Sequence, residues 1–248
     1  MKEELRISQI IYPSLCDLEG KLSVAGVFSL FMDIATQHAE HLGVGAKDML
    51  SRGLFWLTVK TKVRILRRPG MMETVTLTTC PLVPERMRAI REYAMEQNGE
   101  LLAQGKTEWA VLDTTTGRLH PMKGIFAPVL TLSDEPAFPA AFSRMDPDFS
   151  GCETLGTWTV RATDIDLGGH MNNVAYLRAL LSLLPSGELK AFPEGNVELF
   201  FRNSCFEGDE LTFLRRPTPC GLEFGAFRPD GTPAILVHAE HAQASRGA

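Results

Sequence analysis

The sequence predicts an α+β protein built from two copies of one unit, and three observations point to this. A short Asp-Leu-x-Gly turn occurs twice, within Asp17–Ser23 and within Asp166–Asn172. An apolar segment and then segments of alternating polarity follow each copy. Each half ends with a hairpin signal, Asn98-Gly99 in the first and Asp230-Gly231 in the second. Because the features repeat in the same order, each half should be one helix packed on an antiparallel sheet.

In the first half, the apolar segment Val24–Leu42 predicts a helix buried on several sides, with Ser23 as its N-cap and Gly43 as its stop. Alternating polarity over Phe55–Leu66 predicts the first strand after this helix. The remaining strands of this half are expected at Glu73–Thr79, before the Asn98-Gly99 turn from Tyr93, and at Ala103–Leu112.

The second half repeats this order in a shorter form. A helix is expected at Asn173–Leu184, followed by strands at Val197–Phe206, at Glu210–Leu214, from Phe224 to the Asp230-Gly231 turn, and at Ala234–Ala242. The segment from about Pro128 to Gly151 is rich in Pro, Ser, Asp and Ala and shows no period. We therefore expect an N-terminal domain of residues 1–128, a linker of residues 129–150 and a C-terminal domain of residues 151–248.

Composition narrows the class of protein. The net charge of −5 gives no overall attraction to nucleic acid or to an anionic membrane. The five cysteines are odd in number and widely spaced, which disfavours a disulfide framework and fits a reducing cytoplasm. No signal-peptide core is found, and no apolar run reaches the roughly 20 residues of a membrane helix. A soluble cytoplasmic protein is expected.

The segment Asp164–Tyr176, with Asp-Leu-Gly-Gly-His-Met-Asn-Asn ahead of a buried helix, resembles the hotdog-fold thioesterases. Two such units in one chain, together with Gln37–Gly43, Trp56–Arg64 and Thr107–Asp113, resemble the acyl-acyl-carrier-protein (acyl-ACP) thioesterases of plants and bacteria. The resemblance implies a double hotdog, in which two antiparallel sheets each pack on a long central helix. It also implies hydrolysis of fatty acyl-ACP, which releases free fatty acid and terminates fatty acid synthesis, with acyl carrier protein as partner and without a cofactor.

Asp166 is the expected nucleophile or general base, because it precedes a buried helix, where burial can raise a carboxyl pKa and strengthen the base. The alternative is a turn or capping role, since Asp17 takes the same place in the other half. His170 corresponds to Lys21, so the fold does not require an imidazole there. His170 could orient Asp166, polarise the carbonyl or shuttle a proton, or it could be a structural histidine.

Asn172 and Asn173 lie at the expected start of the second helix. One of them should cap it, while the N–H groups of the helix end could polarise the thioester carbonyl. Two positions depart from the family pattern: Gly168 replaces an Asn, and Ser204 stands where a catalytic Glu is often found. Ser204 could hold a water in place of that Glu. Cys205 matches a Cys of the plant members, although a cysteine in an apolar strand is usually inert.

Two further patterns leave alternatives open. His38-Ala-Glu-His41 and His238-Ala-Glu-His241 have metal-like spacing, but they lie on different kinds of element, so no metal site is expected. The basic run Lys60, Lys62 and Arg64, with Arg67, Arg68, Arg86, Arg88 and Arg91 nearby, is either a solvated sheet face or a dock for acidic acyl carrier protein.

Two other functions compete with acyl-ACP hydrolysis. One is hydrolysis of acyl-coenzyme A, and the other is a non-catalytic module that binds acyl groups or acyl carrier protein, which Gly168 and Ser204 favour. The first half, with Phe28, Phe31 and Met32, would help to line the acyl slot. Because hotdog units commonly work in pairs, the chain could act as a monomeric pseudo-dimer or as a homodimer.

Overall fold

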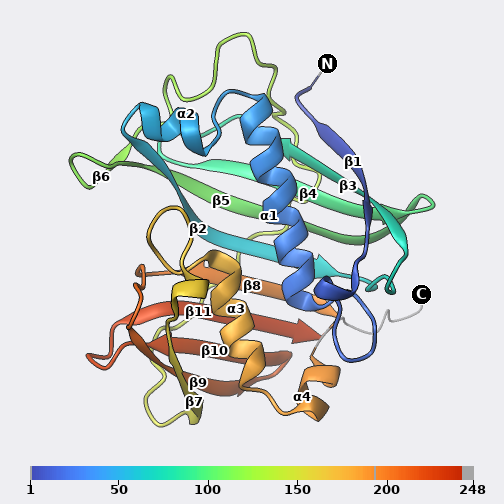
Figure 1. The fold of residues 1–248 in the computed structure, drawn as a ribbon, viewed down its shortest axis with the longest axis vertical. Helices are drawn as coiled ribbons and strands as arrows, with labels where there is room; N and C mark the ends of the chain where they lie inside the picture. Colours follow the sequence, from blue (N-terminus) through green and yellow to red (C-terminus); the bar gives the residue numbers. More distant parts are fainter. Residues whose placement is uncertain (1, 193, 242–248) are drawn as a thin grey trace. The chain divides into compact units, whose positions relative to one another are not determined.

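A computed structural model describes residues 2–192 and 194–241 of the chain. The chain forms two compact units: unit 1 is Met1–Val63 with Arg67–Ala140, and unit 2 is Arg64–Leu66 with Ala141–Ala248. In each unit one helix lies across an antiparallel sheet, α1 in unit 1 and α3 in unit 2 (Figure 1). The expected repeated α+β unit is therefore confirmed.

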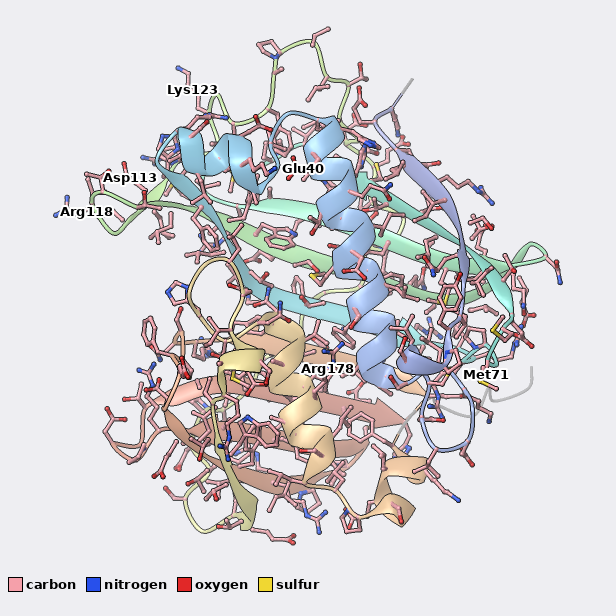
Figure 2. All side chains as sticks on the ribbon, viewed as in Figure 1. Glu40, Met71, Asp113, Arg118, Lys123 and Arg178 are labelled. Atoms are coloured by element: carbon pink, nitrogen blue, oxygen red, sulfur yellow. The ribbon has the colours of Figure 1, made fainter. Side chains whose placement is uncertain are left out.

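Unit 1 contains β1 (Leu5–Ile10), a 3-10 turn (Pro13–Leu15), α1 (Val24–His41), α2 (Ala46–Ser51), β2 (Leu54–Ile65), β3 (Thr74–Pro81), β4 (Ala89–Gln97), β5 (Glu100–Asp113) and β6 (Arg118–His120). The strands lie in the order β1-β3-β4-β5-β2, and β6 pairs with β5. The predicted N-cap of α1 is confirmed, because the Ser23 hydroxyl accepts a hydrogen bond from the Gly26 N–H at 2.9 Å. Near the other end of α1, Glu40 accepts from the Ala46 N–H at 3.1 Å, at the start of α2 (Figure 2).

Unit 2 contains β7 (Glu153–Thr159), a 3-10 turn (Ala162–Asp164), α3 (Asn173–Ser182), α4 (Ser186–Ala191), β8 (Gly195–Phe201), β9 (Glu210–Thr218), β10 (Gly221–Phe227) and β11 (Pro233–His241). Its strands lie in the order β7-β9-β10-β11-β8, which is the order of unit 1. Ala242, the expected end of the last strand, lies outside the described residues.

Hydrogen bonds establish which residues correspond in the two units. In unit 1 the N–H of Leu22, just before α1, donates to the carbonyl of Pro69 at 2.8 Å. In unit 2 the N–H of Met171, just before α3, donates to the carbonyl of Cys205 at 2.7 Å. Pro69 and Cys205 are therefore equivalent, and so are the residues before them, Arg68 and Ser204.

The strands of the two hairpins also correspond, although their turns differ, since Gly231 has a positive φ of 82° and Asp230 does not. Asn98 and Gly99 both have positive φ, 51° and 83°, as the two central residues of a tight hairpin turn require. The β4–β5 ladder shifts register after Met95, and the β10–β11 ladder shifts after Ala226. Because a β-bulge marks one position on a strand, the residues of β4 and β10 can be aligned one by one.

Two elements are shorter in the structure than the sequence predicts. The second helix, α3, has 10 residues against 18 in α1, and it ends at Ser182. The strand expected at Val197–Phe206 ends at Phe201, so Ser204 and Cys205 lie in a loop and not in the sheet. The reason is visible in the backbone: the N–H groups of Arg202 and Asn203 both donate to the Ala234 carbonyl, which ends the regular ladder.

The expected linker contains no helix or strand in residues 129–150, all of which the structure describes. Its two ends lie against different units. In unit 1, the buried Glu92 accepts hydrogen bonds from the N–H groups of Ala137 and Phe138 at 2.7 and 3.0 Å. In unit 2, the buried Glu198 accepts from the Ser143 N–H at 2.8 Å.

The core of each unit lies between helix and sheet. The Phe31 ring of α1 stacks on Tyr93 of β4 with ring centroids 5.0 Å apart. In unit 2, Tyr176 of α3 meets Phe201 of β8 at 5.9 Å. Burial of each such ring contributes roughly 1.5–3 kcal/mol, so these helices are held mainly by packing. No helix among the described residues is both long and apolar enough to cross a membrane.

Candidate active site

The segment 165–171 forms a tight turn directly before α3. Ile165 and Met171 form an isolated bridge, and the N–H of Asp166 donates to the His170 carbonyl at 3.0 Å. Gly169 has a φ of 74°, a left-handed conformation that favours glycine. The Asp166 side chain bends back onto the turn, where its Oδ1 atom accepts from the Gly168 N–H at 2.8 Å. The turn thus determines where the carboxylate lies.

Asp166 is exposed to solvent, so the expectation that it is buried is wrong. The turn projects from the unit, and the neighbouring Leu167 is 76% exposed. Within the described part of the chain, only the Gly168 N–H donates to the Asp166 carboxylate, and no cation pairs with it. Burial therefore cannot be what prepares Asp166 for catalysis, and its role stays a prediction.

His170 is half-buried, and its ring lies 5.1 Å from the Phe206 ring at an interplanar angle of 51°. Among the described residues, no hydrogen bond joins the His170 ring to the Asp166 carboxylate. The link between these two residues is through the backbone, from the Asp166 N–H to the His170 carbonyl. The structure brings both residues into one turn without forming a carboxylate–imidazole pair.

Asn172 caps α3, as expected for one of the two asparagines. Its side-chain oxygen accepts from the Val174 N–H at 2.9 Å, and its own N–H donates to the Asp164 carbonyl at 2.7 Å. Asn173 is the first residue of the helix and is half-buried. The positive end of the α3 dipole therefore lies directly beside the turn that carries Asp166.

The loop between β8 and β9 packs against this turn through the bond from Met171 to the Cys205 carbonyl. Cys205 is buried, and its N–H donates to the Tyr176 hydroxyl at 3.1 Å. Burial raises the pKa of the Cys205 thiol, which favours the inert role over that of a nucleophile. Ser204, by contrast, is exposed on the same loop.

Arg228 contacts this loop, although no pattern in the sequence indicates it. Its Nη2 atom donates to the Ser204 carbonyl and lies 3.3 Å from the Asp209 carboxylate and 3.9 Å from the Cys205 sulfur. Arg228 comes just before the Asp230-Gly231 turn, a place where no local pattern predicts a distant contact. It holds the loop that carries Ser204 and Cys205.

Asp17, the counterpart of Asp166, is in a different environment. Its carboxylate accepts hydrogen bonds from the N–H groups of Glu19 and Lys21 at 2.9 and 3.2 Å, and it is bonded to the buried guanidinium of Arg68. Burial alone would raise the pKa of Asp17, but these hydrogen bonds and the Arg68 charge hold it below its usual value.

Ser204 stands at the position of Arg68. The turn is the same in both units, but in unit 2 the arginine that clamps the aspartate is missing. The exposed Asp166 therefore keeps a carboxylate that is open to an approaching substrate or water.

The basic run around β2 does not form one cationic face. Lys62, Arg68 and Arg91 are buried, and Arg88 pairs with Glu108 at 3.1 Å. The expectation of a solvated face is therefore wrong for the run as a whole. A dock for acyl carrier protein that uses exposed members such as Arg64 and Arg86 stays a prediction.

The histidines of the two expected pairs lie on elements other than the Asp166 turn. His38 is buried on α1, and His238 is buried on β11 between Glu223 and Glu240. Among the described residues, no group of three or more His, Cys, Asp or Glu side chains is arranged to hold a metal ion.

Comparison with known proteins identifies the class. The N-terminal domain of the acyl-ACP thioesterases matches residues 9–127, and their C-terminal domain matches residues 152–232. An acyl-ACP thioesterase from Bacteroides thetaiotaomicron has a similar structure, with a TM-score of 0.86 at 19% identity over 96% of this chain and 97% of that one. The 12:0-ACP thioesterase from Umbellularia californica gives 0.80 at 18% identity over 97% of each chain. The fold is the expected double hotdog.

The chain belongs to the acyl-ACP thioesterase family. Among curated relatives, the oleoyl-acyl carrier protein thioesterase 1 of Arabidopsis thaliana is 21% identical over 87% of this chain and 64% of its own length. The palmitoyl-acyl carrier protein thioesterase of Cuphea hookeriana is 22% identical over 82% of this chain and 52% of its own length. The chain therefore spans about half to two thirds of the relatives that it matches.

Proposed function

We propose that this protein hydrolyses the thioester of fatty acyl-ACP, releases free fatty acid and thereby ends fatty acid synthesis. Membership of the family supports the substrate, and the curated relatives are thioesterases of oleoyl- and palmitoyl-acyl carrier protein. The observation that carries the proposal is the difference between Asp17 and Asp166. One aspartate is clamped by Arg68, whereas the other is exposed beside a helix N-terminus.

In the proposed reaction, Asp166 takes a proton from a water whose oxygen bonds to the thioester carbonyl carbon, and the carbon–sulfur bond then breaks. Alternatively, Asp166 attacks the carbonyl itself and expels the thiolate, which leaves an acyl-aspartyl anhydride that water then hydrolyses. The N-terminus of α3 stabilises the negative charge that develops on the carbonyl oxygen. His170 polarises the carbonyl or carries a proton to the departing thiolate, so that the products are a fatty acid and a thiol. Asn172 supports this arrangement by fixing the start of the helix.

Unit 1 has a different task in this proposal. Its aspartate is paired, and Lys21 replaces the histidine, so it has no equivalent of the Asp166–His170 turn. Its α1 helix instead buries Phe28 and Phe31, with Met32 half-buried beside them. These side chains would hold the acyl chain against the helix-facing side of the unit 1 sheet.

The test is turnover of purified acyl-ACP thioesters by wild type and by Asp166→Ala. Removal of the general base should lower kcat/KM by about 10²–10⁴, while thermal melting stays close to that of wild type because Asp166 is exposed. Full activity in a folded Asp166→Ala protein would contradict the assignment. If wild type binds acyl-ACP without cleaving it, the non-catalytic alternative, which Gly168 and Ser204 favour, is correct.

The same assay with acyl-coenzyme A decides between the two carriers, since kcat/KM should be higher for acyl-ACP. We further propose that the protein works in the cytoplasm as a monomer, with the two units of one chain replacing a dimer. The absence of any disulfide among the five cysteines is compatible with a reducing compartment. A mass measurement on the active species should give a single chain.

A further inference from the structure

Unit 1 holds polar side chains at the interface between α1 and the sheet, where an apolar lining would be expected. The Tyr93 hydroxyl and the Trp109 indole N–H are both enclosed, and neither has a hydrogen-bond partner in the part of the chain that the structure describes. Arg91 is also buried; it bonds to His38 Nδ1 at 2.9 Å and to the Thr79 hydroxyl at 3.4 Å. No carboxylate among the described residues pairs with Arg91.

These groups lie close together on one face of the sheet. Arg91 of β4 is paired in register with Thr107 of β5. Because the strands are antiparallel, Tyr93 and Trp109 lie on opposite sides of this pair, where they are paired with Gly105 and Ala89. Alternate residues of a strand share a face, and the stacking of Tyr93 on Phe31 shows that this face meets α1. Thr107 and Trp109 are near enough to the Tyr93 hydroxyl to oppose the rise in its pKa that burial causes, without forming a bond of normal geometry.

The cluster offers more hydrogen-bond donors than acceptors, since its only acceptors are the Tyr93 and Thr107 hydroxyls. An indole N–H and a guanidinium can only donate. His38 already accepts the bond from Arg91, and burial together with the Arg91 charge lowers the pKa of His38 to about 4, so it is neutral. Buried polar groups in native proteins almost always have partners, so two unpaired donors beside a buried cation need an explanation.

The fold itself does not require these residues. Aligned on the shared bulge, the positions of Arg91, Tyr93 and Thr107 in unit 2 are Leu222, Phe224 and Ala239. All three are apolar, and Phe224 and Ala239 are buried. At these three positions unit 2 builds the same sheet with apolar side chains, while the counterpart of Trp109 is the exposed His241. The buried polar groups of unit 1 therefore point to a ligand there.

We propose that the cluster of Arg91, Tyr93, Thr107 and Trp109 binds an oxygen atom carried on the acyl chain, so that the protein prefers oxygenated acyl groups to plain hydrocarbon ones. The inference rests on the proposed function, which places the acyl chain on this side of the unit 1 sheet. The shared chemistry is a hydrogen-bond acceptor, which a hydroxyl, an oxo group or a second carboxylate at the chain end can supply.

The test measures binding of free fatty acids, so that it does not depend on hydrolysis. Acids of equal length, either saturated or bearing a hydroxyl, an oxo group or a terminal carboxylate at successive positions, are titrated into the full chain by calorimetry. At least one oxygenated acid should bind about 10-fold more tightly than the saturated acid, the effect expected of one or two hydrogen bonds. The position and chemical kind of the oxygen in the acid that binds most tightly identify the preferred acyl group.

Tyr93→Phe should remove most of this preference and leave the affinity for the saturated acid unchanged. It deletes only an unpartnered hydroxyl, so the melting temperature should not fall, and Trp109→Phe serves as a second variant. The matched control is Tyr12→Phe, which alters an exposed tyrosine of the same unit. The proposal is overturned if no acid binds, if none of the oxygenated acids is preferred (as when a water alone fills the site), or if Tyr93→Phe leaves the preference intact.

Failure of the proposed function is a separate result. If an oxygenated acid binds through Tyr93 but no acyl-ACP or acyl-coenzyme A is cleaved, the chain is a non-catalytic binding module. The proposed binding site for oxygenated acyl groups is then still supported. If the thioester is cleaved but all acids of one length bind equally well, the proposed hydrolysis is supported and the proposed binding site for oxygenated acyl groups is wrong.

Discussion

Residue 68 and residue 204 explain how one turn can serve two purposes. Arg68 neutralises Asp17 in a buried pair, and the exposed Ser204 leaves Asp166 without such a partner. A buried ion pair loses several kcal/mol when one partner is removed, so Asp17 is tied to stability. Asp166 makes no such ion pair, so its replacement should lower the turnover rate more than the stability.

Restoring the clamp in unit 2 should therefore switch off the site. Ser204→Arg places a guanidinium where Arg68 lies in unit 1, and we expect it to reach Asp166 and lower kcat/KM by about 100-fold or more, as loss of a general base does. Ser204→Gln has similar reach without the charge and should lose much less activity. Equal activity of Ser204→Arg and wild type would contradict the role of Asp166.

His38 should make stability depend on pH. Its pKa is lowered from 6.5 to about 4 by burial and by the charge of Arg91. The unfolded chain therefore binds a proton at a higher pH than the folded one, so stability is lost as the pH falls from 6.5 towards 4. Between pH 7 and pH 5 the loss should be about 2 kcal/mol, at about 1.4 kcal/mol per pKa unit.

The measurement is urea unfolding of wild type and His38→Gln at pH 7 and pH 5. The glutamine oxygen can still accept from Arg91, but it does not titrate in this range. The variant should therefore lose less stability than wild type over the same interval. His241→Gln, a change at an exposed histidine of unit 2, should leave the pH dependence as it is.

At the scale of elements, α1 and α3 each begin with a capping side chain, next to the Asp17 turn in unit 1 and the Asp166 turn in unit 2. Ser23 accepts from Gly26 N–H, and Asn172 accepts from Val174 N–H, each at 2.9 Å. Replacing either with Ala should cost about 1 kcal/mol, which chemical unfolding can measure. Only Asn172→Ala should also lower turnover, because only α3 borders the Asp166 turn; equal effects of both changes on kcat would argue against this.

Elements set by local patterns were predictable from the sequence. The cap of α1, the two hairpin turns and most strands follow from capping residues, Asx-Gly pairs and alternation, all of which act within a few residues. The end of β8 was not predictable, because it depends on the distant Ala234 carbonyl. The same holds for Arg228, which reaches Ser204 across 24 residues of sequence.

The exposure of Asp166 was also missed, for a related reason. The sequence shows that the turn precedes a buried helix, but not that the turn projects from the unit. The repeat, in contrast, led to Asp166 and His170, because it shows which side chains differ between equal positions; their catalytic role stays a prediction. Comparison of the two copies was more informative than any single motif.

At the scale of the whole molecule, the segment expected to be a linker makes specific contacts with the folded units. Glu92, buried in the unit 1 sheet, accepts two N–H groups of the segment, and Lys2 of the N-terminal region pairs with Glu135 at 3.2 Å. In unit 2, Phe142, Met145 and Phe149 pack with Phe200 and Leu236. Composition identified the segment as irregular, but irregular structure is compatible with tight attachment.

Glu92→Gln should loosen the first part of this segment. An amide retains one acceptor oxygen but turns an NH2 group towards one of the two backbone donors, at a cost of about 1–3 kcal/mol. Limited proteolysis should then cut residues 133–140 faster than in wild type, with cleavage located by mass spectrometry. The control is Glu135→Gln, an exposed carboxylate of the same segment; similar cleavage rates in both variants would show that Glu92 is not the anchor.

The bulges after Met95 and Ala226 show that the two halves share a backbone plan, although their buried side chains differ. In a homodimer of identical hotdog units, every substitution is made twice, so a change that helps one site is imposed on its twin. Joining the units in one chain breaks that symmetry. One unit can then acquire charged and hydroxyl side chains at buried positions that are apolar in the other unit. Each unit can also be mutated without changing the other.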